Sequence, residues 1–449
     1  MKDEAPMDLK RTDVKRREPS LFPPAPNFAP PLADRGEGIY ILDTEGNRYI
    51  DGCGGAMTVS LGHSNQEILQ GMKDQMDRIT FTYRNQFYSE ALETLSNRLA
   101  RLAPGEGNKA AFANSGSEAT ELALKMVYSY WRGQGKPLKQ RIISRWSSYH
   151  GSTMGSLSMS GNPGRRKEYA PYLKDYPLLE LPLCSHCPYE KTYPECDIFC
   201  ARYLEKLIRR IGSENIAAFI AEPITGASGA GITPPDEYFP IIERICREND
   251  ILLIFDEVIT GIGRTGTFFA CEHWNVKPDI ICFGKGIASG YAPIAGILAS
   301  ERVASSVDAF STGHTFSGNP LSAATANRVL DYMEKHELLE KVEKMGIRLE
   351  SSLKALKAKY PDLIHEVRGK GLLWGIELRD KGELFEPERR AAAKMVELCF
   401  QKGLLVYPSA GYIDGFLGES ILLSPPYIIT EEEMDELIGI LDLSLSAFN

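Results

Sequence analysis

The chain has 449 residues, of which 43% are hydrophobic and 25% are charged, and its formal net charge is -9. This composition is typical of a globular protein with two domains, or with one large α/β unit and additions. The negative charge disfavours nucleic acid and anionic membranes as partners, and no apolar run has transmembrane length. Nine cysteines, several of them inside apolar runs, favour reduced thiols and a cytoplasmic protein over a disulfide framework.

The N-terminal part combines a polar segment with a hairpin and two helices. Residues 1 to about 35 are polar and rich in proline, which predicts an extended arm with little structure. Two alternating strands on either side of Glu45-Gly46-Asn47 predict a hairpin. Apolar residues at helical spacing then predict helices over 65–79 and 88–102.

The rest of the chain predicts an α/β fold with a second, smaller domain. Strand and helix patterns alternate from about 110 to 300, which indicates a largely parallel sheet covered on both faces. A long helical region then runs to about residue 360, and the tail alternates again as a smaller α+β domain. We therefore expect an arm (1–35), an N-terminal part of the small domain (36–70), a large domain (71–330) and a C-terminal small domain (331–449).

An acid and a lysine follow two apolar strands of the predicted sheet. Asp256 ends the run ILLIFD, and Lys285 follows DIICF by two residues. Groups just past the C-terminal ends of parallel strands converge on the ligand crevice of an α/β sheet. Pyridoxal phosphate (PLP) needs both groups, because a lysine forms a Schiff base with its aldehyde and an acid pairs with its ring nitrogen. Asp256 and Glu257 could equally cap a helix or bind a metal in a nucleotide-binding protein, but no GxxxxGK[ST] loop is present.

A turn at residues 115–118 offers a site for a phosphate. Ser115-Gly116-Ser117-Glu118 follows a short strand and matches a capping box at the start of a helix. The free N–H groups and the positive end of such a helix attract anions. A well-capped helix without a ligand is the alternative interpretation.

Taken together, the motifs identify a family. NSGSEATE, SSYHGST, FIAEPI, IFDEVITGIGRTG, DIICFGKGIASGYAPI and GHTFSGNPLSAA occur in order, and the chain from about Gly38 to its C-terminal helix resembles the class III aminotransferases. These are PLP enzymes of fold type I, so the resemblance implies a large domain with a mostly parallel central sheet and a smaller α+β domain. It also implies a homodimer, possibly a tetramer, with shared active sites.

The resemblance further implies roles for individual residues. Lys285 would hold PLP as a Schiff base and then move protons between substrate and cofactor, while Asp256 would pair with the pyridinium nitrogen. Val258 and Tyr149 would contact the two faces of the cofactor ring, with His150 beside Tyr149. Ser115, Gly116 and Ser117 would bind the phosphate, and Thr315 would reach the phosphate from the neighbouring subunit. Glu222 would lie near the cofactor and the substrate.

The substrate pocket departs from the family pattern. Many members bind an α-carboxylate through an arginine shortly before the tail motif, and that place falls on Gly415 here. A glycine cannot supply a bidentate guanidinium contact. Either another residue such as Arg84 binds the carboxylate, or the amine substrate lacks an α-carboxylate, as an ω-amine does. Met57 stands where some amine-type members carry a large aromatic residue.

Four cysteines form a second pattern. Cys184, Cys187, Cys196 and Cys200 have the spacing CxxC, eight residues, CxxxC, which could bind zinc. The loop between the pairs is short for a zinc ribbon, and Cys200 begins an amphipathic helix. We expect packing thiols and no metal, with zinc or a disulfide as alternatives.

The predicted activity is the transfer of an amino group. An ω-amine, an ω-amino acid or another amine donor would pass its amino group to a keto acid such as pyruvate or 2-oxoglutarate, in a ping-pong scheme. An aminomutase, a racemase or a decarboxylase on the same PLP scaffold is the alternative within enzymes. A non-catalytic PLP-binding protein is the remote alternative, and the roughly 35-residue arm is too short for the DNA-binding module that such proteins need.

Overall fold

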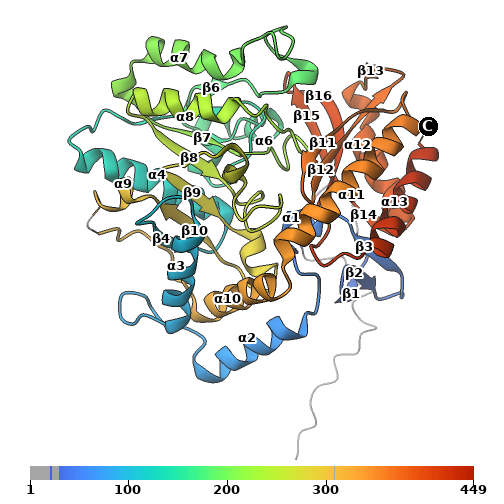
Figure 1. Cartoon of the computed structure of the whole chain (residues 1–449), viewed down its shortest axis with the longest axis horizontal. Helices are drawn as coiled ribbons and strands as arrows, with labels where there is room; N and C mark the ends of the chain where they lie inside the picture. The colour runs from blue at the N-terminus through green and yellow to red at the C-terminus, as the bar shows by residue number, and fades with distance from the viewer. Residues whose placement is uncertain (1–20, 23–29, 308, 449) are drawn as a thin grey trace, which may run out of the picture.

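The computed structural model describes residues 21–22 and 30–448 except residue 308 (Figure 1). Most of the expected arm lies outside the described residues. Its expected end at about residue 35 is slightly too late, because strand β1 (Ala33–Glu37) pairs with strand β2 (Tyr40–Asp43). Among the described residues, no helix is both long and apolar enough to cross a membrane.

A seven-stranded sheet forms the centre of the larger part of the molecule, in the order β4-β10-β9-β8-β7-β5-β6. The strands from β9 to β6 are parallel to their neighbours, whereas β10 is antiparallel to both β9 and β4. The expectation of a largely parallel sheet is therefore confirmed. The strand bounds are β4 (Lys109–Ala113), β5 (Arg141–Arg145), β6 (Leu178–Leu179), β7 (Ile216–Ala221), β8 (Leu252–Asp256), β9 (Ile280–Phe283) and β10 (Ala295–Ala299).

Helices cover both faces of this sheet because its inner strands are apolar on both sides. On β7, Ala218 and Ile220 pack with helix α4, while Phe219 and Ala221 pack with α7 and α8 on the opposite face. The helices of this part are α2 (Gln66–Arg78), α3 (Glu90–Leu102), α4 (Gly116–Gly133), α5 (Met154–Met159), α6 (Pro163–Arg166), α7 (Phe199–Ile211), α8 (Tyr238–Glu248), α9 (Glu301–Ala304) and α10 (Pro320–Lys335).

The C-terminal part is built on an antiparallel sheet in the order β11-β12-β16-β15. The helical region expected to run to about residue 360 is interrupted, because Glu337 has a φ of 49° and separates α10 from α11. The elements are α11 (Leu338–Lys359), β11 (Ile364–Lys370), β12 (Leu373–Asp380), β13 (Glu383–Leu384), α12 (Ala391–Gln401), β15 (Tyr407–Ile413), β16 (Leu417–Leu423) and α13 (Glu431–Ser446).

A small sheet joins the two ends of the chain. The expected hairpin is present as β2 (Tyr40–Asp43) and β3 (Arg48–Asp51), and β3 pairs in parallel with β14 (Leu404–Leu405). The N-terminal strands accordingly lie beside the C-terminal elements, blue beside orange and red in Figure 1. The short helix α1 (Gly54–Met57) follows β3 and leads back to the central sheet. The four-part domain division itself stays a prediction.

Candidate active site

A cavity of about 260 Å³ lies where the central strands end. Asp256 is the last residue of β8, Lys285 follows β9 by two residues, and Glu222 directly follows β7. This convergence is the one expected at the C-terminal edge of a parallel sheet. The lining residues are Ala56, Met57, Gly116, Ser117, Tyr149, His150, Gly151, Arg165, Glu222, Ala227, Asp256, Val258, Ile259, Lys285 and Tyr407.

Asp256 is held by an imidazole and by the backbone. Its Oδ2 lies 2.8 Å from Nδ1 of His150, and its Oδ1 accepts a hydrogen bond from the Val258 N–H at 3.2 Å. Both side chains are buried, and Nε2 of His150 has no protein partner. Because Oδ2 is the acceptor, the bond places a proton on Nδ1. A fixed carboxylate therefore faces the cavity.

Lys285 brings an amine into the same cavity. It begins a short 3-10 helix (Lys285–Ala288), and its Nζ donates a hydrogen bond to the Ala56 carbonyl at 2.8 Å. Burial lowers the pKa of Lys285 to about 8, although the carboxylates of Asp256 and Glu222 oppose this shift. A larger share of the amine is thus unprotonated near neutral pH than in an exposed lysine, and an unprotonated amine is a nucleophile.

Glu222 is a buried acid beside these two groups. Its two carboxylate oxygens accept backbone N–H bonds from Tyr149 at 3.0 Å and from Gly226 at 2.9 Å. Burial raises its pKa, and the charge of Asp256 raises it further. The hydrogen bonds orient the glutamate and also fix the backbone of Tyr149.

Glu257 points away from the cavity, although it follows Asp256 directly. Its carboxylate accepts hydrogen bonds from the backbone N–H groups of Ala270 and Cys271 at 3.0 and 2.8 Å and from the Thr260 hydroxyl at 2.5 Å. These contacts hold the loop after β8. The alternative in which Asp256 and Glu257 share a metal is therefore wrong.

The other end of the cavity is the start of helix α4. Gly116 and Ser117 are its first two residues, so their N–H groups have no acceptor within the helix. A Cβ on Gly116 would lie 2.8 Å from Val258, and a Cβ on Gly151 would lie 2.7 Å from the Ser117 hydroxyl. Small residues therefore keep this end of the cavity open.

The expected capping box is only half formed. Ser115 accepts the Glu118 N–H at 3.2 Å, but the Glu118 carboxylate bonds to the backbone of Asn114 at 2.7 Å and not to that of Ser115. Ser115 caps the helix and does not line the cavity.

These groups fit PLP. The cavity presents a buried carboxylate for a ring nitrogen, an amine of lowered pKa for an aldehyde, and free helix N–H groups for a phosphate. Val258 and Tyr149 line it between these ends. The residues predicted to contact the cofactor and the substrate thus lie in one cavity, except for Ser115, Arg84 and Thr315.

Arg84 and Thr315 lie elsewhere on the same chain. Arg84 lines a separate hollow of about 970 Å³, and its guanidinium donates to the Thr312 carbonyl at 3.4 Å. Arg84 therefore does not line the cavity of its own chain, and its role in binding a substrate carboxylate stays a prediction. Thr315 is exposed, and the exposed rings of Phe81 and Phe316 contact each other beside it.

Six lining residues were not expected from the sequence, and two of them, Arg165 and Tyr407, bring polar groups to the cavity. Arg165 comes from the one-turn helix α6, and Tyr407 begins β15 in the C-terminal part. No motif marks either residue, because both reach the cavity through tertiary packing. Met57, which was expected, does line the cavity.

The four clustered cysteines line one small cavity of about 20 Å³. They are free thiols, as are the other five cysteines, so the disulfide alternative has no support. No three of the four sulfur atoms meet within 4.8 Å in the described chain. That the four cysteines are packing thiols and bind no metal stays a prediction.

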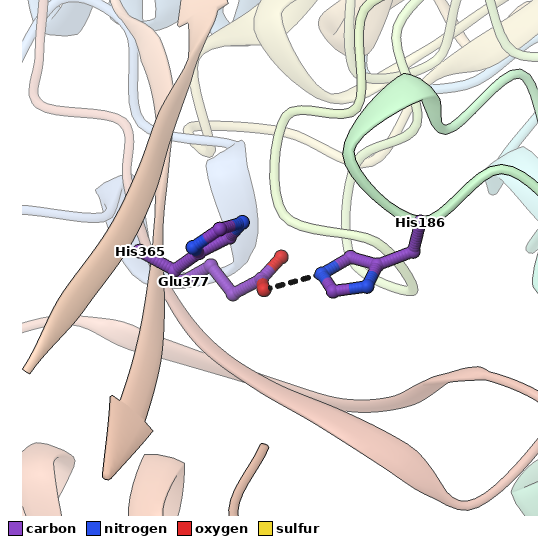
Figure 2. Close-up of side chains that lie close together, drawn as sticks. All are labelled: His186, His365 and Glu377. Carbon is purple, nitrogen blue, oxygen red and sulfur yellow. Dashed lines mark hydrogen bonds and ion pairs between the residues drawn. The ribbon is translucent and has the colours of Figure 1, made fainter. Parts of the chain in front are cut away.

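A histidine pair beside this loop has the spacing of a metal site. His186, His365 and Glu377 place one ligand atom each within 4.8 Å of the others, and His186 lies 2.8 Å from Glu377 (Figure 2). Glu377 is, however, already paired with Arg368 at 2.7 Å and Arg379 at 3.4 Å. Two guanidinium charges disfavour a cation there. The cluster instead ties the loop to β12.

Comparison with known proteins agrees with this site. The sequence profile of the family "Aminotransferase class-III" matches residues 24–445. The chain is 41% identical to "Uncharacterized aminotransferase YodT" of Bacillus subtilis, over 95% of this chain and 97% of that protein. It is 35% identical to "Gamma aminobutyrate transaminase 3, chloroplastic" of Solanum lycopersicum, over 92% and 80%. A PLP-bound amine transaminase from an uncultivated Pseudomonas species superposes with a TM-score of 0.88 at 32% identity, over 96% and 100%.

The fold and the cavity define a PLP enzyme of fold type I. The chain belongs to the class III aminotransferases.

Proposed function

We propose that this aminotransferase moves an amino group from an ω-amine or ω-amino acid to a keto acid such as pyruvate or 2-oxoglutarate, in two half-reactions. The observation that carries the proposal is the amine of Lys285 in one cavity with the buried Asp256–His150 pair. Bound PLP would act as an electron sink for the carbanion that forms when the substrate loses a proton.

Lys285 would attach the cofactor and then act as the base. Its lowered pKa, about 8, favours an amine that can accept a proton from the substrate carbon and return it. The Ala56 carbonyl, 2.8 Å away, holds the Nζ in position. Proton transfer therefore needs no additional base.

Asp256 would keep the ring nitrogen of the cofactor protonated, and His150 would keep Asp256 in place. A carboxylate buried beside a cation is stabilised in its charged form. The backbone N–H of Val258 fixes the second carboxylate oxygen. The pair thus supports the cofactor as electron sink without itself exchanging protons.

The glycine at position 415 supports a donor of the ω type. Gly415 lies against Pro163, and a Cβ on Gly415 would lie 3.0 Å from the proline Cγ. No guanidinium can project from this point toward the cavity. A donor whose reacting carbon carries no carboxylate is therefore favoured over an α-amino acid.

We also propose a homodimer in which Thr315 completes the partner's site. Thr315 is exposed and lies outside its own cavity, while Phe81, Phe87, Tyr88 and Phe316 form an exposed apolar surface around the same region. Exposed apolar patches of this kind favour subunit contacts. Because Arg84 bonds to the Thr312 carbonyl, it would lie near the partner subunit's cavity together with Thr315. A tetramer would need a further surface.

A panel of amine donors tests the activity. Holoenzyme is mixed with each donor and with pyruvate or 2-oxoglutarate, and the cofactor absorbance and the new amino acid are followed. Amino transfer from ω-amines with either acceptor is expected. One carbonyl product per active site is expected without an acceptor, because the first half-reaction needs none. Repeated turnover without an acceptor would instead indicate mutase, racemase or decarboxylase chemistry and would contradict the proposal.

Lys285→Ala is the matched control for this panel. The variant keeps the Asp256–His150 pair and the helix N-terminus, so it should still bind the cofactor but transfer no amino group. Borohydride reduction should fix the cofactor to the wild type and not to the variant. Cofactor fixed to Lys285→Ala would remove the lysine from its proposed role.

A cytoplasmic location is proposed as well. It rests on nine cysteines that are all free, as expected under reducing conditions. Thiol labelling of freshly isolated, denatured protein should modify all nine. A smaller number would indicate disulfides and contradict the proposal.

A further inference from the structure

Arg165 brings a second positive charge to the cavity. It lies in α6, whose first turn is capped by Asn162, where the side-chain oxygen accepts the Arg165 N–H at 3.1 Å. Asn162 is itself buried, so the start of this short helix is anchored in the protein. The arginine side chain is exposed and reaches the cavity that contains Lys285.

The guanidinium of Arg165 is oriented by aromatic side chains. Its central carbon lies 4.6 Å from the centre of the Tyr149 ring, and one of its nitrogens lies 3.5 Å from the Tyr407 hydroxyl. Stacking on a ring leaves the edges of a guanidinium available for a bidentate contact. Tyr149 is in turn fixed by Glu222 through its backbone N–H.

Arg165 is a charged group of this cavity that is not paired with a carboxylate; Lys285, the other cationic group, bonds to the Ala56 carbonyl. Asp256 is paired with His150, and the oxygens of Glu222 accept two backbone N–H groups. In the described part of the chain, Arg165 forms no ion pair with a carboxylate; its side-chain contacts are the two tyrosines. A pocket with an unpaired arginine is suited to an anionic ligand.

The position of Arg165 is linked to that of Gly415. Gly415 abuts Pro163, the first residue of the helix that carries Arg165, and its φ of 84° favours glycine. A larger residue there would crowd Pro163, because its Cβ would lie 3.0 Å from the proline Cγ. Gly415 itself supplies no contact to a carboxylate. Its small size, however, leaves room for the helix that carries Arg165.

We propose that Arg165 binds the carboxylate of acidic substrates within its own subunit, and that it thereby selects the keto acid and the ω-amino acid. This inference rests on the proposed function and narrows its substrate class. The substrate carboxylate would lie between the guanidinium and the Tyr407 hydroxyl. An amine without a carboxylate would react without using Arg165.

Arg84 is the rival for this role. It lies outside the cavity of its own chain, so it could bind a substrate only across a subunit interface. Assigning the role to Arg165 and assigning it to Arg84 therefore predict different results. Loss of Arg165 should affect the acid directly, whereas loss of Arg84 should act only in the assembled dimer.

The test measures the two half-reactions separately with cofactor-loaded protein. Benzylamine, which has no carboxylate, converts the cofactor to its amino form, and pyruvate converts it back. Arg165→Ala should raise the KM for pyruvate about 10- to 100-fold, the range for losing a hydrogen-bonded contact to a charged group, with a smaller change in kcat. The rate with benzylamine should stay within about twofold.

Three further variants sharpen the test. Arg165→Lys should restore part of the pyruvate binding, because the charge returns without the bidentate geometry. Lys167→Ala, a matched loss of an exposed positive charge two residues on and outside the cavity lining, should change neither half-reaction. Arg84→Ala should leave the selectivity between pyruvate and benzylamine unchanged.

Calorimetric titration with propionate gives a readout that needs no turnover. Propionate should bind the wild type and Lys167→Ala alike and bind Arg165→Ala more weakly. Equal binding to all three proteins, or equal losses with pyruvate and benzylamine, would overturn the role of Arg165. Absence of any amino transfer in the wild type would instead overturn the proposed function, while the propionate titration would still decide the role of Arg165.

Discussion

The Nδ1 atom of His150 lies 2.8 Å from Oδ2 of Asp256, and both side chains are buried in the cavity. The two residues are 106 positions apart: His150 follows strand β5, and Asp256 is the last residue of β8. Their contact fixes a carboxylate that has no other side-chain partner in the described structure. The cavity consequently has one anionic end and one anion-binding end.

Changing Asp256 to asparagine should separate cofactor binding from catalysis. The amide keeps the shape of the side chain but loses its charge. Turnover should fall roughly 10²- to 10³-fold, the loss typical of removing one preorganised electrostatic contact. Cofactor absorbance and steady-state rates measure the two effects, and an unchanged rate would remove Asp256 from its role.

His150→Ala should have a smaller effect than Asp256→Asn. It removes one hydrogen bond to a charged group, which typically contributes about 1.5–3 kcal/mol, or about 10- to 100-fold in rate. The charge of Asp256 remains. Rates of the two variants, measured with the same donor and acceptor, check the order; the reverse order would show that the histidine contacts the reacting groups itself.

Cofactor uptake should depend on pH through Lys285. Its pKa is lowered to about 8, so the reactive unprotonated amine increases as pH rises through this value. The rate at which apoprotein forms the covalent complex with PLP should therefore rise with pH and level off above about pH 9. Stopped-flow absorbance between about pH 6.5 and 9.5 measures the profile. A rate that still rises about tenfold per pH unit up to pH 9.5, as for the ordinary pKa of 10.5, would show that burial does not act on this amine.

A methyl group at position 151 should weaken cofactor binding. A Cβ on Gly151 would lie 2.6 Å from the Ser156 hydroxyl and 2.7 Å from the Ser117 hydroxyl, and its φ of 130° adds strain. We expect Gly151→Ala to raise the Kd for PLP at least about tenfold, since one lost contact to a phosphate contributes about 1.5 kcal/mol or more. Fluorescence titration of the apoprotein measures this Kd.

Gly46→Ala is the control for backbone strain alone. Gly46 also has a positive φ, 87°, but nothing lies within 4 Å of a Cβ there. It should cost about 1 kcal/mol of folding free energy without changing the Kd for PLP. If Gly46→Ala weakened cofactor binding as much as Gly151→Ala, the close approach at Ser117 would not be the cause.

An acidic residue at position 316 should disrupt the proposed dimer. Phe316 is 61% exposed and packs against Phe81. Phe316→Asp should therefore shift the protein toward monomer in analytical ultracentrifugation, and it should lower cofactor affinity because Thr315 would no longer reach the partner's phosphate end. Phe416→Asp, at a similarly exposed phenylalanine of the C-terminal sheet, should do neither.

The cofactor end of the site could be predicted from sequence because local patterns specify it. Asp256 ends one buried strand and Lys285 follows another by two residues, and strand ends converge in every parallel sheet. Gly116 and Ser117 begin a helix that the sequence marks with a cap. Predicting these residues required only the order of the helices and strands and the family motifs.

The substrate end could not be predicted in the same way. Arg165 lies in a single turn of helix and owes its position to Tyr149 and to Tyr407, 242 residues away. Arg84 belongs to a motif-like segment, yet that segment packs beside Thr312 on an outer surface. Contacts between distant segments decide which arginine faces the cavity, and no local pattern encodes them.

The parallel pairing of β3 with β14 has a consequence for the order of synthesis. Ile50 pairs with Leu404, and the segment after β3 supplies Ala56 and Met57 to the cavity. During translation, the strand that anchors this segment emerges only after roughly nine-tenths of the chain has been made, at Leu404 of 449 residues. Lys285 is therefore synthesised well before Ala56 and Met57 can be held in place beside it. The cavity for PLP can accordingly be completed only near the end of translation.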